Sequence, residues 1–169
     1  MITLARINRM DLEAFVTAFG DVAEHSPWVA ENAFGKAPFA DREAVINAFE
    51  TAMNAASGDR QLALVRAHPD LAGKAALAGE VAEDSKREQA GAGLNTLSPE
   101  EFARFTQLNT RYKTKFGFPF IFAVKGATKH MILAAFEDRI ANSAEDELAT
   151  ALTQIARIFR FRLEDRISK

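Results

Sequence analysis

The sequence predicts an all-α protein, a single compact multi-helix domain of about seven to nine helices over residues 1–169. Two observations favour this class: apolar residues recur at helical spacing along most of the chain, and cap residues precede several of these stretches. A third observation is the one exception, an apolar segment at about 118–124 that carries Pro119 and follows Gly117. We expect this segment to be non-helical.

The first predicted helix begins at Asn8, which can cap it with Asp11 at the third position. Apolar residues then fall on one helical face as far as Phe19, and Gly20 offers a stop. Residues 21–40 are less regular, because glycines and prolines interrupt them.

A second helix is predicted to begin at Asp41, with an apolar stripe formed by Val45, Phe49 and Met53. The segment Ser57-Gly58-Asp59 ends it and begins another helix that runs towards His68. Since a proline disfavours helical geometry in the residue before it, Pro69 places His68 at a helix end.

The middle of the chain carries two further helix starts. Residues 70–84 are rich in alanine and are expected to be helical in part, after which Ser85 and Glu88 have capping-box spacing. Ser98 is a stronger start, followed by a proline and by an acid at the third position. The helix that begins there is expected to end at Gly117.

Two helices complete the chain, one from about Thr128 and one capped by Ser143. In the last helix Arg162 continues a stripe that includes Ile155 and Phe159. An arginine there either extends its guanidinium to solvent or holds an anion in a partly buried site, and we favour the first interpretation.

Composition excludes several classes of function. The formal net charge is −2 and basic residues are interspersed with acids, so a nucleic-acid surface is not expected. Cysteine is absent, which excludes disulfides, thiolate metal sites and cysteine nucleophiles. No segment has the apolar length of a membrane span, and neither a signal-peptide pattern nor a peroxisomal Ser-Lys-Leu end is present. We therefore expect a cytoplasmic protein that binds neither nucleic acid nor membranes.

Three histidines are the candidate proton-transfer groups. His25 and His130 have no acidic partners at metal-ligand spacing, so we interpret both as surface or packing residues and expect no metal site. His68 lies beside a proline and Asp70 at a helix end, where it is either a packed cap or a catalytic group.

Two other segments also have a structural and a functional interpretation. Residues 85–89 form a capped helix start, or they present N–H groups, a carboxylate and an amide to a polar ligand. The segment Phe116–Ile121 is a strand or buried connector, which we favour on spacing alone, or it presents a row of backbone donors to an anion or carbonyl.

Taken together, three segments resemble the family of 2-oxo-4-hydroxy-4-carboxy-5-ureidoimidazoline (OHCU) decarboxylases of urate breakdown. They are the segments Ala67–Lys74, Ser85–Gly91 and Phe116–Ile121, which match in residues, order and separation. Shorter matches at 26–31, at Leu108-Asn109 with Tyr112, and at 137–140 extend the resemblance over nearly the whole chain.

The resemblance implies an all-helical, cofactor-free enzyme that is typically a homodimer and converts OHCU to S-allantoin and carbon dioxide. His68 corresponds to the catalytic histidine, and we expect Glu88 to fix its orientation. The positions expected to contact the substrate are Pro69, Ser85, Lys86, Arg87, Glu88, Gln89, Phe120, Ile121, Phe122, Ala123 and Val124. Arg162 is a further candidate that could offset the negative charge of the substrate.

Two other classes of function stay open. A helical binding module would retain the pocket and bind ligand without turnover. A metal-dependent hydrolase is disfavoured, because the sequence lacks paired histidines.

Overall fold

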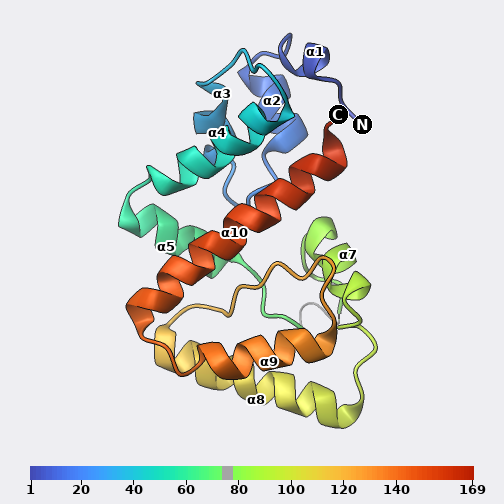
Figure 1. Cartoon of the computed structure of the whole chain (residues 1–169), viewed down its shortest axis with the longest axis vertical. Coiled ribbons are helices and arrows are strands. Elements are labelled where there is room, and N and C mark those ends of the chain that lie inside the picture. Colours follow the sequence, from blue (N-terminus) through green and yellow to red (C-terminus); the bar gives the residue numbers. More distant parts are fainter. Residues whose placement is uncertain (74–77) are drawn as a thin grey trace. The chain divides into compact units, whose positions relative to one another are not determined.

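The computed structural model describes residues 1–73 and 78–169. In these two stretches it contains nine helices and no strand (Figure 1). This confirms the all-α prediction. The helices are α1 Leu4–Ile7, α2 Leu12–Phe19, α3 Trp28–Phe34, α4 Arg42–Asn54, α5 Gly58–Ala67, α7 Glu83–Gly91, α8 Pro99–Phe116, α9 Lys129–Arg139 and α10 Ala144–Arg166.

The chain divides into two compact units. The first comprises Met1–Ala67 with Ala156–Lys169, and the second comprises His68–Ile155, so the long helix α10 contributes to both. The single domain expected from the sequence stays a prediction. The longest helices are α10 and α8, and neither they nor any other helix in the described ranges could cross a bilayer.

The first unit is built around a cluster of phenylalanines. The ring of Phe15 lies 5.0–6.2 Å, centroid to centroid, from four other rings, those of Phe19, Phe34, Phe39 and Phe49. Close to the two ends of the chain, Ile2 and Ile167 form an isolated parallel bridge. These contacts give the first unit a core of its own.

The helix predicted to begin at Asn8 corresponds to α2, and its predicted start is wrong by three residues. Asp11, not Asn8, caps α2, and its Oδ1 accepts a hydrogen bond from the N–H of Ala14 at 2.8 Å. Asn8 instead ends α1, and its side-chain amide both donates to and accepts from the backbone of Phe39. The partner that occupies Asn8 is 31 residues away, so local spacing could not reveal it.

Helix α3 lies within residues 21–40, where no helix was predicted. It has only seven residues, and its N-cap Pro27 offers no side-chain hydrogen bond, so the usual start signal is missing. The next two starts are as predicted. Asp41 caps α4 through the N–H of Ala44, and the hydroxyl of Ser57 accepts from the N–H of Arg60 at the start of α5.

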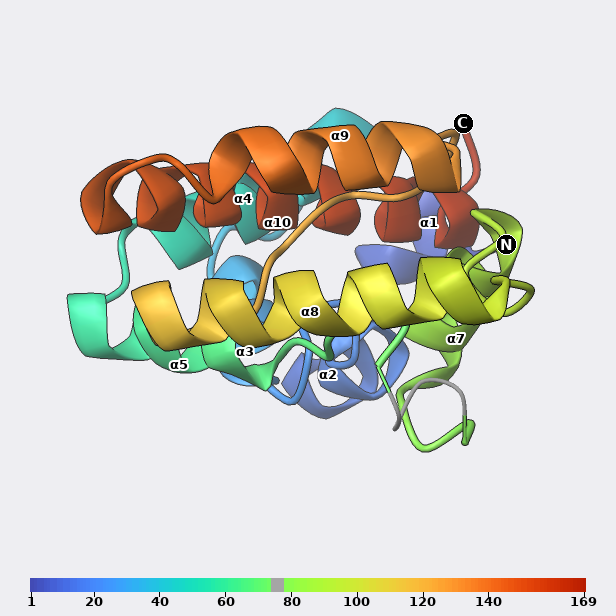
Figure 2. The ribbon, with the colours of Figure 1, turned by 90° about the horizontal axis from the view of Figure 1, so that it is seen from below.

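In the second unit, α8 and α9 lie side by side and run in the same direction (Figure 2). Ser98 and Glu101 form the predicted capping box of α8, and Gly117 ends the helix in the left-handed conformation, with φ 76°. Thr128 caps α9 and the hydroxyl of Ser143 accepts from the N–H of Asp146 in α10, so both predicted starts are confirmed.

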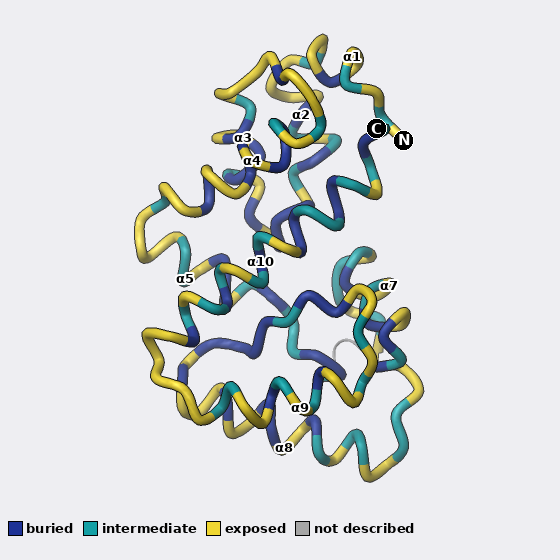
Figure 3. Tube along the Cα trace, in the orientation of Figure 1, coloured by how far each residue is buried: buried dark blue, intermediate teal, exposed yellow. Residues whose placement is uncertain are grey.

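The non-helical segment predicted at about 118–124 is confirmed. It belongs to the connection 117–128, which returns along α9 so that the next helix can run parallel to α8 (Figure 2). An extended chain covers more than twice the length per residue of a helix, so a connection of this length suffices. Most of 118–124 is buried (Figure 3).

The helix start predicted at Ser85 needs a correction, whereas the partial helix predicted for 70–84 is consistent with the described residues. Among the described residues of 70–84 only Glu83 and Asp84 are helical, and residues 74–77 lie outside the described part. Helix α7 begins at Glu83 with Ala82 as N-cap, which makes no side-chain hydrogen bond. Ser85 therefore lies inside the first turn and is not the cap. The acids at 83 and 84 suit this earlier start, since negative charge is favourable at a helix N-terminus.

Candidate active site

His68 is the first residue after α5 and the first residue of the second unit. The helix ends where Pro69 requires it to end, one residue before His68. The histidine is only 7% exposed. A titratable ring at a helix end, largely removed from water, is suited to proton transfer with a bound molecule.

Two buried amides hold the loop that follows His68. The N–H of Ala72 donates to Oε1 of Gln89 in α7, and Nδ2 of Asn109 in α8 donates to the carbonyl of Leu71, both at 2.9 Å. Ala72 has a positive φ of 53°, which costs a non-glycine residue backbone energy. The two amide contacts fix the backbone in this unfavourable conformation.

Helix α7 presents two different faces. Ser85 and Gln89 are four residues apart and both are buried, whereas Lys86 and Arg87 are exposed and Glu88 is intermediate. Oε1 of Gln89 is used by Ala72, but its Nε2 is buried and has no hydrogen-bond acceptor within residues 1–73 and 78–169. A buried donor without an acceptor is costly, so Nε2 is a candidate ligand contact.

The segment Phe120–Val124 is attached at two backbone atoms. Nη1 of Arg139 donates to the carbonyl of Ile121 at 2.6 Å, and the N–H of Ala123 donates to Oε1 of Gln154 at 2.9 Å. The other four N–H groups of this segment, those of residues 120, 121, 122 and 124, donate to no residue that the structure describes. They provide the row of donors that the sequence raised as one alternative.

The phenylalanine side chains of this segment contribute to the core. The ring of Phe120 stacks on the ring of Phe136, with 3.9 Å between their centroids. The guanidinium of Arg139 also lies over the Phe120 ring, 4.3 Å from its centroid. Tyr112 packs edge-on against the same ring. Packing therefore uses the side chains and leaves the backbone donors available, so the two interpretations of this segment are compatible.

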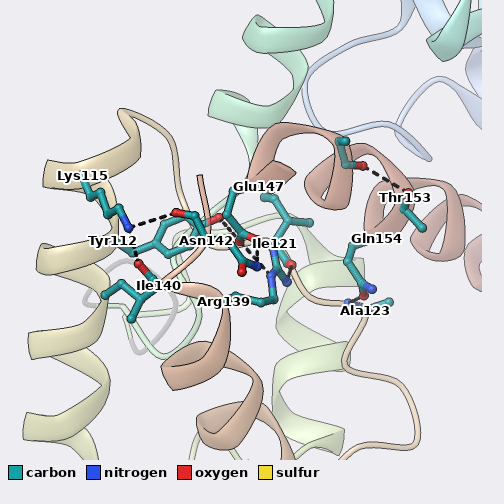
Figure 4. Close-up of polar contacts among 11 residues, drawn as sticks. Tyr112, Lys115, Ile121, Ala123, Arg139, Ile140, Asn142, Glu147, Thr153 and Gln154 are labelled. Carbon is teal, nitrogen blue, oxygen red and sulfur yellow. Dashed lines mark hydrogen bonds and ion pairs between the residues drawn. The ribbon is translucent and has the colours of Figure 1, made fainter. Parts of the chain in front are cut away.

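Arg139 is held in place by a buried carboxylate. Glu147 is fully buried, and its Oε1 accepts from Nε of Arg139 at 2.8 Å and from the hydroxyl of Tyr112 at 2.6 Å. Its Oε2 accepts from Nδ2 of Asn142 at 3.1 Å. Figure 4 shows these contacts together with those of Ile121 and Ala123. The network links α8, α9 and α10 to the Phe120–Val124 backbone.

Arg162 does not extend to solvent, so the interpretation favoured from the sequence is wrong. It lies in the first unit, is 3% exposed, and donates to Oε1 of Glu24 at 2.9 Å and to the carbonyl of Val22 at 3.1 Å. Its charge is matched by Glu24, which is also buried. The ion pair gives Arg162 a structural role within that unit, and contact with substrate stays a prediction.

The other two histidines, His25 and His130, are exposed, in agreement with a surface role. Within the described residues no group of three or more His, Cys, Asp or Glu side chains could hold a metal ion. The donors around the candidate site are amides and backbone N–H groups, which suit an oxygen-rich organic ligand better than a metal.

Several residues around the site were not assigned a role from the sequence. Asn109 and Arg139 were noticed only as matches to a family, and Glu147 and Gln154 were not singled out. The sequence nevertheless carried a signal for Glu147 and Gln154. They lie on the α10 face that also carries the buried Ala151, and a polar residue on an apolar stripe needs a buried partner.

The fold and the candidate site define an all-α protein with a histidine, two buried amides and a segment of available backbone donors in one compact unit. Residues 8–164 match the family model described as OHCU decarboxylase. The chain belongs to the OHCU decarboxylase family.

Individual relatives match over nearly the whole chain. It is 42% identical to the 2-oxo-4-hydroxy-4-carboxy-5-ureidoimidazoline decarboxylase of Haloferax volcanii, over 99% of this chain and 97% of that protein. It is 38% identical to the uric acid degradation bifunctional protein of Bacillus subtilis, over 100% of this chain and 33% of that protein. A crystal structure of (S)-allantoin synthase superposes with a TM-score of 0.79 at 30% identity, covering 98% of this chain and 54% of that one.

Proposed function

We propose that this protein decarboxylates OHCU to S-allantoin and carbon dioxide, as a cofactor-independent carboxy-lyase of urate breakdown acting as one domain over residues 1–169. The observation that carries the proposal is the similarity to a protein named for this activity over 99% of the chain. The candidate site supports it, because its available donors suit a ligand rich in carbonyl and carboxylate oxygens.

The proposed chemistry needs no external electron sink. When the bond to the carboxylate breaks, its electron pair moves to the ring carbon, where the adjacent C=N unit of the substrate accepts it. A proton must then reach one face of the carbon of that C=N unit, and loss of the hydroxyl proton from the carbon that carried the carboxylate forms the carbonyl of allantoin. We assign this proton transfer to His68, with Glu88 orienting the imidazole, because the buried histidine lies at a fixed helix end.

Substrate binding is assigned to two sets of donors, the side chain of Gln89 and the backbone of Phe120–Val124. Nε2 of Gln89 and the N–H groups of Phe120–Val124 would donate to substrate oxygens, where preorganised donors stabilise developing charge. Pro69, Ser85 and the phenylalanine rings would exclude water. Lys86 and Arg87 are exposed. Their assignment as substrate contacts, like that of the buried Arg162, depends mainly on the family resemblance.

A homodimer in the cytoplasm completes the proposal, on the basis of the family resemblance. Light scattering coupled to size exclusion tests the first part, with a mass of twice 18.6 kDa as the expected result. A mass of 18.6 kDa at micromolar concentration would contradict it.

The function is tested by mixing the protein with freshly generated OHCU and following its absorbance together with the optical rotation of the allantoin formed. Acceleration over the spontaneous reaction with an excess of the S form is the expected result. Decay at the spontaneous rate would favour the alternative of a binding module. Activity that disappears on dialysis against a chelator and returns with zinc would favour a metal-dependent hydrolase.

A further inference from the structure

We propose that Arg139 and Gln154 are positioning residues that hold Phe120–Val124 by one edge, so that the N–H groups of the opposite edge are aimed at the substrate. The inference rests on the proposed function, since it names the residues that set the geometry of the proposed binding segment. Neither side chain is assigned a contact with the reacting atoms.

The first argument comes from the positions, along the segment, of the two contacts made by Arg139 and Gln154, which we call the anchors. Arg139 binds the carbonyl of Ile121 and Gln154 binds the N–H of Ala123, two residues further along. The segment has neither helix nor turn from 119 to 124. In extended chain, residues two apart direct their backbone groups to the same edge and the residues between them to the other. For an extended segment this alternation places the N–H groups of Phe120, Phe122 and Val124 on the edge that neither anchor occupies.

The rigidity of the anchors gives the second argument. Arg139 is fixed by Glu147 and by the ring of Phe120, and Glu147 is fixed in turn by Tyr112. Gln154 lies on α10 seven residues after Glu147, which is about two helical turns on the same face. Both anchors thus depend on packed helices, and the backbone donors are held in place before any ligand arrives, as electrostatic preorganisation requires.

Gln154 offers the cleaner test, because removing Arg139 would also leave Glu147 buried without its cationic partner. Gln154→Ala deletes the acceptor of the Ala123 N–H, whereas Gln154→Glu keeps an acceptor at the same position. Thr153→Ala is the matched control, since Thr153 is the exposed neighbour on α10 and its hydroxyl donates to the carbonyl of Ala149 and to no other group in the described part of the chain (Figure 4).

We expect Gln154→Ala to lower kcat for OHCU by roughly tenfold to hundredfold, the scale of a small misplacement of catalytic groups. KM should change less than kcat, because the donors act mainly on charge that develops in the transition state. Gln154→Glu should retain most of the activity and Thr153→Ala all of it. Unchanged kinetics in Gln154→Ala, or equal losses in the Ala and Glu variants, would overturn the proposal.

Amide hydrogen exchange at Ala123, read by NMR on the protein without substrate, is independent of turnover. Protection at Ala123 should fall in Gln154→Ala and persist in Gln154→Glu and Thr153→Ala. Protection that is unchanged in Gln154→Ala would overturn the anchoring role. If the wild-type protein fails to accelerate OHCU loss, the proposed function fails, while exchange at Ala123 still decides whether Gln154 holds the segment.

Discussion

The hydroxyl of Tyr112 donates a hydrogen bond to Oε1 of Glu147 across 2.6 Å in the interior of the second unit. The same oxygen accepts from Arg139, which binds the carbonyl of Ile121 (Figure 4). One buried carboxylate therefore connects the core of α8 to the backbone of the candidate site. Substitution of Glu147 or of its hydrogen-bond partners should therefore affect both the stability of the protein and the placement of the Phe120–Val124 backbone.

Tyr112 should resist ionisation as long as the protein is folded. Burial raises its pKa well above the ordinary value of 10.0, and the hydrogen bond to Glu147 raises it further. A raised pKa means that the folded state holds this proton more tightly than the unfolded state. The corresponding stability is present below pH 10 and is lost as the pH rises towards the folded-state pKa.

Ultraviolet titration reads this group alone, because Tyr112 is the only tyrosine in the chain. Phenolate absorbance is expected to appear together with the loss of the helical circular dichroism signal. Ionisation near pH 10 in protein that keeps its helical signal would contradict the buried contact.

Glu147→Ala should destabilise the protein by roughly 3–5 kcal/mol, because it leaves the guanidinium of Arg139 partly buried without a carboxylate. The matched control is Glu137→Ala, which removes the exposed partner of Arg104 and should cost less than about 1 kcal/mol. Urea unfolding of both variants gives the comparison. Equal losses would mean that the Glu147 network contributes no more than a surface ion pair.

Substitutions of Gln89 should separate the two roles of its amide. Gln89→Glu keeps the acceptor for the N–H of Ala72 but lacks the Nε2 donor, so we expect a reduced kcat/KM in protein that remains folded. Gln89→Leu also leaves the Ala72 N–H without an acceptor and should destabilise the protein by roughly 1–3 kcal/mol. Full activity in Gln89→Glu would remove Nε2 from the proposed substrate contacts.

The sequence located most helix starts because these depend on neighbours a few residues away. Asp41, Ser98 and Thr128 each cap a helix through an N–H three residues along. Asn8 was misassigned because its amide is occupied by Phe39, far along the chain. Ser85 was misassigned because α7 starts two residues earlier, without a side-chain cap.

The candidate site was predictable to a similar extent. Pro69 placed His68 at a helix end, and Pro119 indicated the non-helical segment, since both effects act on the adjacent backbone. Gln154 and Glu147 act on residues 31 and 35 positions away, and the buried pair of Arg162 and Glu24 spans 138 positions. The apolar face of α10 marks Glu147 and Gln154 as polar residues that need buried partners, but no local spacing identifies those partners, so the roles themselves required the fold.

The comparison of wild type with His68→Asn on fresh OHCU tests the central claim most directly. The rate of OHCU loss should fall by at least about a hundredfold, the usual scale of acid–base catalysis. Helical circular dichroism should be unchanged, and the variant should yield no excess of S-allantoin over the spontaneous reaction. A variant that retains near-wild-type turnover and the same optical rotation of its product would contradict the account, because His68 would then not transfer the proton.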